Sequence, residues 1–148
     1  MKTHTIILAA GKGTRMNTNL PKVMQPLGGK SLIAHVINTA QEISKKVTVV
    51  VGHQKDFLKD HLAEIDPNIA TVNQENQHGT AHAVKTASHL IQDDEKVLIL
   101  YGDVPLISNN TIQSLLNSEN KCTLLSMTLS DPTGYGRVIS NEENLALK

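Results

Sequence analysis

Residues 5–15 read Thr5-Ile6-Ile7-Leu8-Ala9-Ala10-Gly11-Lys12-Gly13-Thr14-Arg15, an apolar run that leads directly into a glycine-rich segment. A short continuous apolar run that ends in a turn is typical of a strand buried on both faces. We therefore expect a strand over residues 5–10. The small residues after it would let backbone N–H groups approach a ligand closely.

Apolar strands and helices alternate along the rest of the chain. The pattern predicts further strands over residues 47–51, 69–73, 96–101 and 121–129, with another beginning at 137–140. It predicts helices over residues 32–43, 55–64, 80–91 and 109–116, the first of them capped by Ser31. Such alternation indicates an α/β fold with a doubly wound, mostly parallel sheet and helices on both faces. Ligands bind such sheets beyond the carboxyl ends of the strands.

Composition narrows the class of protein. The chain has 148 residues, 14 basic and 14 acidic side chains, and only 2% aromatic residues. That length fits one domain, and the neutral balance argues against a nucleic-acid partner. No apolar run is long enough for a membrane span or a signal peptide, so we expect no membrane partner and a cytoplasmic location. The lone Cys122 lies in an apolar run and is expected to be a buried thiol.

The glycine-rich segment is a candidate phosphate site. Lys12, Arg15 and Lys22 follow the first strand within eleven residues, and their charges could neutralise phosphates cradled by backbone N–H groups. A plain turn with solvated cations is the alternative, which the three clustered cations disfavour. Met16 stands where a dinucleotide fingerprint needs its third glycine, and Met24 stands where a P-loop needs its first.

Asp103 is the candidate metal ligand. It follows the strand over residues 96–101 in the segment Tyr101-Gly102-Asp103-Val104-Pro105. Mg²⁺ typically takes one or two carboxylates together with phosphate oxygens and water. A turn or helix-capping aspartate is the equally weighted alternative when this motif stands alone.

Two further segments are rich in polar residues and glycine. Gln74 ends a predicted strand and could offer its amide to a nucleobase, and Gly79-Thr80 begins the next helix. A polar capping loop is the alternative. His78 and His82 have helical metal spacing, but no third ligand accompanies them, so a zinc site is disfavoured. In Asp131-Pro132-Thr133-Gly134-Tyr135-Gly136-Arg137, two glycines flank Tyr135, which fits either backbone close to a ligand or a tight hairpin.

Taken together, these segments resemble the nucleotidyltransferase domain of the bacterial N-acetylglucosamine-1-phosphate uridyltransferases. The matching stretches are Leu8–Met16, Leu20–Val23, Gln74 with Gly79-Thr80, Tyr101–Leu106 and Asp131–Arg137. The resemblance implies a Rossmann-like nucleotide-diphospho-sugar transferase fold that is incomplete at its carboxyl end. We therefore expect residues 1–148 to form the N-terminal part of that domain, without the β-helix acetyltransferase domain, through which the parent protein would be a homotrimer.

The resemblance also implies roles for individual residues. Leu8, Ala9, Ala10 and Gly11 would hold uridine through backbone contacts, and Gln74, Gly79 and Thr80 would read the uracil. Arg15 and Lys22 would act as catalytic residues that neutralise phosphates, with Lys12 assisting. Tyr101, Gly102 and Asp103 would line the nucleotide and metal site, with Asp103 holding Mg²⁺, and Gly136 would lie beside the amino sugar.

The resulting hypothesis is an enzyme that joins UTP to N-acetylglucosamine 1-phosphate and releases pyrophosphate, for cell-wall and lipopolysaccharide precursor synthesis. Two alternatives remain open. One is a nucleotide-binding fragment without turnover, and the other is a nucleotidyltransferase for another sugar phosphate or base.

Overall fold

The computed structural model describes residues 2–11, 13, 18, 20–143 and 145–146. It divides into two units, Met1–Leu116 and Asn117–Lys148, and each unit is described by itself. None of the helices in the described ranges has the length and apolar character that a bilayer crossing requires.

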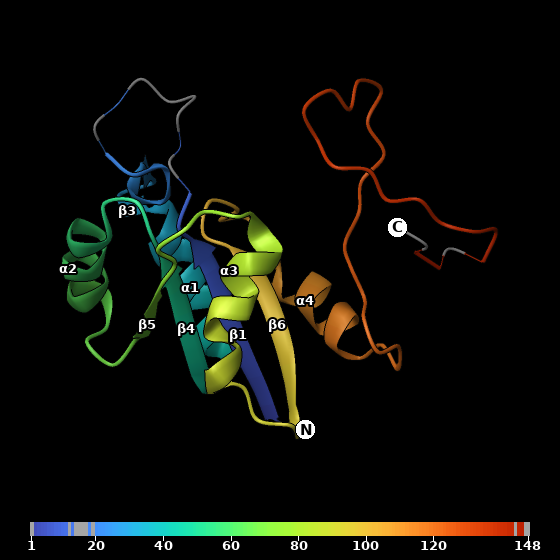
Figure 1. The fold of residues 1–148 in the computed structure, drawn as a ribbon, viewed down its shortest axis with the longest axis horizontal. Helices are drawn as coiled ribbons and strands as arrows, with labels where there is room; N and C mark the ends of the chain where they lie inside the picture. Colours follow the sequence, from blue (N-terminus) through green and yellow to red (C-terminus); the bar gives the residue numbers. More distant parts are fainter. Residues whose placement is uncertain (1, 12, 14–17, 19, 144, 147–148) are drawn as a thin grey trace. The chain divides into compact units, whose positions relative to one another are not determined.

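A four-stranded parallel sheet forms the centre of the first unit (Figure 1). Its strands are β1 (Lys2–Ala9), β4 (Lys46–Val51), β5 (Ala70–Asn73) and β6 (Glu95–Tyr101), in the spatial order β5-β4-β1-β6. All four were expected from their apolar runs, and the parallel pairing confirms the α/β class. The chain adds strands outward from β1 to β5 and then returns to place β6 on the other side of β1. Ligands bind open sheets at such a reversal.

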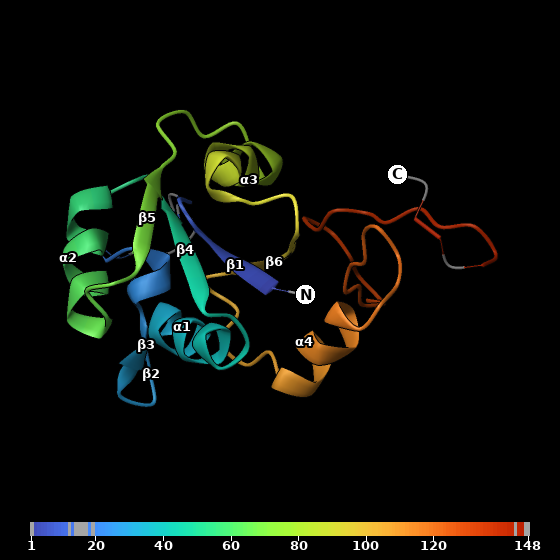
Figure 2. The ribbon, with the colours of Figure 1, turned by 90° about the horizontal axis from the view of Figure 1, so that it is seen from below.

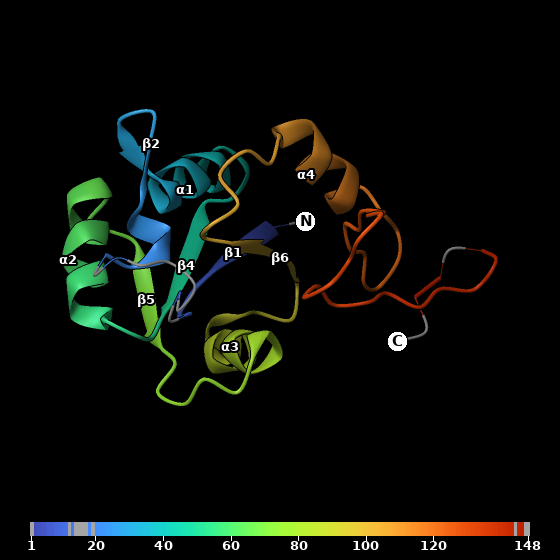
Figure 3. The same ribbon diagram turned by 90° about the horizontal axis from the view of Figure 1, so that it is seen from above.

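Helices cover both faces of this sheet, as Figures 2 and 3 show from opposite sides. The helices are α1 (Leu32–Ile43), α2 (Lys55–Ile65), α3 (Thr80–Ala87) and α4 (Asn109–Leu116), with short 3₁₀ turns η1 (Lys22–Met24) and η2 (Ser88–Leu90). Side chains of α1, α2, α4 and η1 pack in one apolar cluster with one face of β1, β4 and β6. α3 packs with the opposite face of β1 and β4.

Two predictions concern the ends of helices, and the structure confirms one of them and corrects the other. Ser31 caps α1 as predicted, because its hydroxyl accepts a hydrogen bond from the Ala34 N–H at 3.3 Å. A small hairpin of β2 (Pro26–Leu27) and β3 (Lys30–Ser31) leads into this cap. The helix predicted over residues 80–91 is too long: α3 ends at Ala87 and continues as η2, where the Ile91 N–H bonds to the Ser88 carbonyl at 3.1 Å.

The amino ends of the strands carry a buried polar group. His4 is fully buried, with Nε2 2.8 Å from Thr48 Oγ1 and Nδ1 3.4 Å from Glu95 Oε2. Burial, followed by the charge of Lys46, lowers the pKa of His4, although Glu95 opposes the shift. A histidine at this end of the sheet lies opposite the edge at which ligands bind, so we interpret it as structural.

β6 is the last strand of the sheet on its side. Val97, Ile99 and Tyr101 are 37%, 44% and 50% exposed. Ile99 and Tyr101 lie in register with Ile6 and Leu8 of β1. They are therefore on the same face of the sheet as the residues of β1 and β4 against which α3 packs. Burial therefore alternates along β6, unlike along β1, whose residues from His4 onward are buried.

The second unit differs from the expectation. The predicted strands over residues 121–129 and 137–140 are wrong: neither forms a strand, and Ser140 makes only an isolated bridge to Ala146. An apolar run becomes a strand only when a neighbour completes its ladder of hydrogen bonds, and neither run pairs with any of the described strands. Cys122 is exposed, so the buried thiol is also wrong. A turn forms over residues 132–135, one residue later than the turn chemistry at 131–134, and the Tyr135 N–H bonds to the Pro132 carbonyl at 3.0 Å.

Candidate nucleotide site

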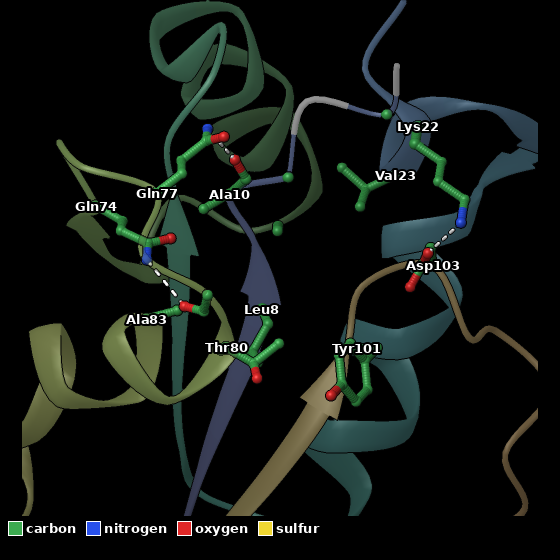
Figure 4. A pocket seen from close by; sticks show the side chains of 14 residues that line it. Leu8, Ala10, Lys22, Val23, Gln74, Gln77, Thr80, Ala83, Tyr101 and Asp103 are labelled. Carbon is green, nitrogen blue, oxygen red and sulfur yellow. Dashed lines mark hydrogen bonds and ion pairs between the residues drawn. The ribbon is translucent and has the colours of Figure 1, made fainter. Parts of the chain in front are cut away.

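A cavity of about 360 Å³ lies beyond the carboxyl ends of β1 and β6 in the first unit (Figure 4). Gln74 and Gln77 lie on one side of it, and Lys22, Tyr101 and Asp103 lie on the other. The sequence pattern predicted a ligand beyond the carboxyl ends of the strands, and the structure adds that the order of strands reverses at this edge.

The floor of the cavity is the end of β1 and the residues that follow it. Leu8, Ala9, Ala10 and Gly11 all line it, and the first three are buried. Their small side chains leave the backbone accessible to a ligand, which is why a run of alanine and glycine after a strand favours a binding site. The structure therefore brings together the four residues expected to hold the nucleoside.

Gly102 lies beneath the cavity wall, although it is not one of the lining residues. It is buried, and its N–H donates to the Leu8 carbonyl at 3.0 Å. A Cβ atom at this position would come within 3.1 Å of Val23 Cγ1 and 3.2 Å of the Leu8 oxygen. Glycine therefore favours the close approach of the chain after β6 to the end of β1, because a side chain here would crowd Val23 and the Leu8 carbonyl.

Lys22 and Asp103 form an ion pair at the rim. Lys22 begins η1, and its Nζ lies 2.5 Å from Asp103 Oδ2. The two side chains are 44% and 26% exposed, so both can exchange this contact for one with a ligand. A cation and a carboxylate are thus both available at the rim of the cavity.

The opposite wall comes from the end of β5 and the start of α3. Gln74 is 5% exposed and donates from Nε2 to the Gly79 carbonyl at 3.2 Å. Gly79 precedes α3 with φ of +94°, a left-handed conformation that other residues rarely adopt. Thr80, the first residue of α3, also lines the cavity.

Gln77 completes this wall and was not assigned a role from the sequence. Its Nε2 donates to the Ala10 carbonyl at 2.7 Å, which ties the loop before α3 to the end of β1. Val23 and Ala83 also line the cavity without having been expected. Gln77 lies in the polar segment that drew attention to Gln74, but only the folded chain reveals that its partner is 67 residues away.

Three expected site residues lie outside the described part of the first unit. Lys12 and Arg15 lie outside the described residues. Gly136 belongs to the second unit and is exposed there. The other expected residues line the cavity or, for Gly102, support its wall.

The donor set for a metal ion is small. Within the ranges that the structure describes, no group of three or more His, Cys, Asp or Glu side chains lies close enough to hold a metal ion. Asp103 is the one carboxylate among the described lining residues, and none of these residues donates a hydrogen bond to its Oδ1. One carboxylate fits Mg²⁺ when substrate phosphates and water supply the remaining ligands.

Comparison with known proteins agrees with this arrangement. The sequence profile of the MobA-like NTP transferase domain matches residues 5–134. Among solved structures, Rv0371c from Mycobacterium tuberculosis H37Rv superposes with a TM-score of 0.66 at 17% identity, over 78% of this chain and 60% of its own.

Two further structures share the fold. HddC from Yersinia pseudotuberculosis, solved in complex with GMP-PN, has a TM-score of 0.63 at 21% identity, over 78% of this chain and 55% of its own. A nucleotidyl transferase from Methanothermobacter (Mth528) has a TM-score of 0.64 at 22% identity, over 77% of this chain and 56% of its own. The chain therefore spans little more than half the length of these structures.

Proposed function

We propose that this chain, which belongs to the MobA-like NTP transferase family, transfers UMP from UTP to N-acetylglucosamine 1-phosphate and releases pyrophosphate. The family and the structural neighbours support a nucleotidyltransferase. The choice of UTP and of the amino-sugar phosphate rests on the motifs at Tyr101–Leu106 and Asp131–Arg137. The product would serve cell-wall and lipopolysaccharide precursor synthesis in the cytoplasm.

One observation carries the proposal: a single cavity combines an accessible backbone, a buried amide and a pair of opposite charges. In the proposed complex, Leu8–Gly11 contact the nucleoside, and Gln74 with Gly79 and Thr80 contacts the base. Lys22 contacts the phosphates at the opposite wall. Three further contacts are proposed from the sequence alone: phosphate contacts by Arg15 and Lys12, and a sugar contact by Gly136.

The reaction needs little covalent chemistry from the protein. An oxygen of the sugar phosphate attacks the α-phosphorus of UTP in line, and the bond from that phosphorus to the bridging oxygen of the β-phosphate breaks. The electron pair leaves with pyrophosphate. Two anions must approach each other, and their repulsion is strong in a partly desolvated cavity. Lys22 lowers this repulsion and stabilises charge that moves onto the leaving group.

Asp103 is the residue that would hold Mg²⁺, in agreement with its place at the rim and with its Oδ1, to which none of the described lining residues donates. The ion, when bound, neutralises phosphoryl charge. Lys22 must leave Asp103 Oδ2 to contact a phosphate fully. We propose that the ion pair holds both side chains in place until the substrate replaces each partner.

The test combines calorimetry with a pyrophosphate assay. We expect the chain to bind UTP with Mg²⁺ and to release pyrophosphate when N-acetylglucosamine 1-phosphate is added. A panel of four nucleoside triphosphates and several sugar phosphates decides the specificity. Release with another pair would replace the proposed substrates, and absence of any nucleotide binding would refute the proposal.

Binding without release favours a second candidate, a nucleotide-binding fragment without turnover. The specific observation in its favour is that the chain spans 55–60% of the length of the three structural neighbours. We retain as a proposal that residues 1–148 are the N-terminal part of a sugar-nucleotidyltransferase domain whose parent is a homotrimer.

A further inference from the structure

His82 is a histidine of α3 that the metal hypothesis did not explain. His78 and His82 touch edge to face, with ring centroids 5.2 Å apart, but they join no metal-binding group among the residues described. The hydrogen-bond partner of His82 is Gln74, whose Nε2 lies 2.9 Å from His82 Nδ1. This contact connects the histidine to the wall of the cavity.

The contacts of Gln74 fix which end of its amide faces the cavity. A backbone carbonyl can only accept, so the amide nitrogen must be the end that contacts Gly79. The same nitrogen carries a second hydrogen, which points to His82 Nδ1. His82 must therefore accept through an unprotonated Nδ1 and carry its proton on Nε2.

The amide oxygen of Gln74 is consequently left for a ligand. Figure 4 shows the amide oxygen of Gln74 turned away from the dashed hydrogen bond that its amide nitrogen makes. No side chain or backbone group in the described part of the chain donates to this oxygen, although the residue is 5% exposed. This oxygen is not fully buried, so water can reach it in the free protein, and an N–H group of a bound molecule can take the place of that water.

We propose that His82 is a positioning residue that selects keto nucleobases, by holding the Gln74 oxygen toward the bound base. This inference rests on the proposed function, namely that the cavity holds a nucleotide. Uracil and guanine present a protonated ring nitrogen, N3–H and N1–H, which can donate to Oε1. Cytosine and adenine present an unprotonated nitrogen at the same positions, and its lone pair would face the oxygen.

His82 and Gly79 each bond to one hydrogen of the Gln74 amide, so the loss of His82 removes one of the two contacts that orient the amide. Without His82 the amide can rotate or reverse more easily, and a reversed amide would offer N–H to the acceptor nitrogen of cytosine. Because a lost or mismatched buried hydrogen bond changes affinity by roughly 5- to 100-fold, we expect the selectivity to fall by about tenfold.

The experiment measures the ratio of UTP to CTP affinity by calorimetry on the full chain with Mg²⁺. The wild-type chain should bind UTP at least about tenfold more tightly than CTP, and His82→Leu should lose most of this preference. His82→Asn offers an amide oxygen near the position of Nδ1 and should restore it. His89→Leu is the matched control, because His89 lies beyond α3, its ring bonds to the Thr86 carbonyl, and it is not one of the residues that line the cavity.

Separate results refute separate claims. If the wild-type chain binds no nucleotide, the proposed function fails and the inference fails with it. If it prefers UTP and His82→Leu keeps that preference, or if His82→Asn behaves like His82→Leu, the inference alone is wrong. Nitrogen-15 NMR of the wild-type imidazole needs no variant: a proton on Nδ1 of His82 would also overturn the inference.

Discussion

Replacing Lys22 by methionine removes the positive charge from the cavity wall and keeps a long unbranched side chain. In the wild-type chain the Nζ of Lys22 lies 2.5 Å from Asp103 Oδ2, but the side chains of Lys22 and Asp103 are 44% and 26% exposed. Exposed ion pairs contribute about 0–1 kcal/mol, because solvent screens the charges. We therefore expect the free energy of unfolding to change by less than about 1 kcal/mol.

The effect of the same change on turnover should be much larger. Removal of one electrostatic donor to a developing charge typically costs about 2–4 kcal/mol of transition-state stabilisation. That loss corresponds to a fall in kcat of roughly 30- to 1000-fold. Lys22→Met should therefore separate stability from catalysis, because the ion pair contributes little in the free protein and Lys22 contributes strongly once phosphates are bound.

Pyrophosphate release measures kcat and KM, and urea denaturation measures stability. Lys55→Met is the matched control, since the Nζ of Lys55 lies 3.1 Å from Glu75 in an ion pair whose residues do not line the cavity. An unchanged kcat with a raised KM would mean that Lys22 binds substrate and transition state equally. A loss of stability above about 2 kcal/mol would mean instead that the ion pair is structural.

Four further changes have distinct expected outcomes. Asp103→Ala should abolish pyrophosphate release while the circular dichroism spectrum stays unchanged, and near-normal release would remove Asp103 from the proposed metal site. Gly102→Ala should lower stability by about 1–3 kcal/mol and weaken nucleotide binding in calorimetry, because the added methyl group crowds the end of β1. Ser31→Ala should cost about 1 kcal/mol in urea denaturation through the lost cap of α1, and an unchanged midpoint would contradict that role. The pKa of His4 is lowered in the folded chain, so the unfolded chain binds the proton first as the pH falls. The free energy of unfolding should therefore decrease as the pH drops below 6.5. His4→Gln should flatten this dependence in denaturation curves measured at several pH values.

The sheet and most of its helices could be predicted from the sequence because their signals are local. A short continuous apolar run that ends in a glycine-rich turn, such as Thr5–Ala10, is typical of a buried strand, and Ser31 caps α1 through a contact three residues away. The run over residues 121–129 carries the same kind of signal, yet it forms no strand, because a strand also needs a partner that local sequence does not specify.

The candidate site was predictable where backbone and small residues form it. Leu8–Gly11 lie at and just beyond the end of β1, Asp103 follows β6, and parallel strands bring their carboxyl ends to one edge. The contacts of Gln77 and His82 were not predictable, because each depends on the geometry of the loop before α3. The helical spacing of His78 and His82 was considered for zinc and disfavoured for want of a third ligand, and the fold gives His82 an amide as its partner.

The outermost strand has a practical consequence for work with the purified chain. In β6 the charged side chains are confined to Glu95 and Lys96, and the five residues that follow are apolar or aromatic. An edge of this kind can template the addition of a strand from another molecule, since few charges oppose it. We therefore expect β6 to favour intermolecular assembly at high protein concentration. Each assay above should start from dilute samples that light scattering shows to be free of assemblies.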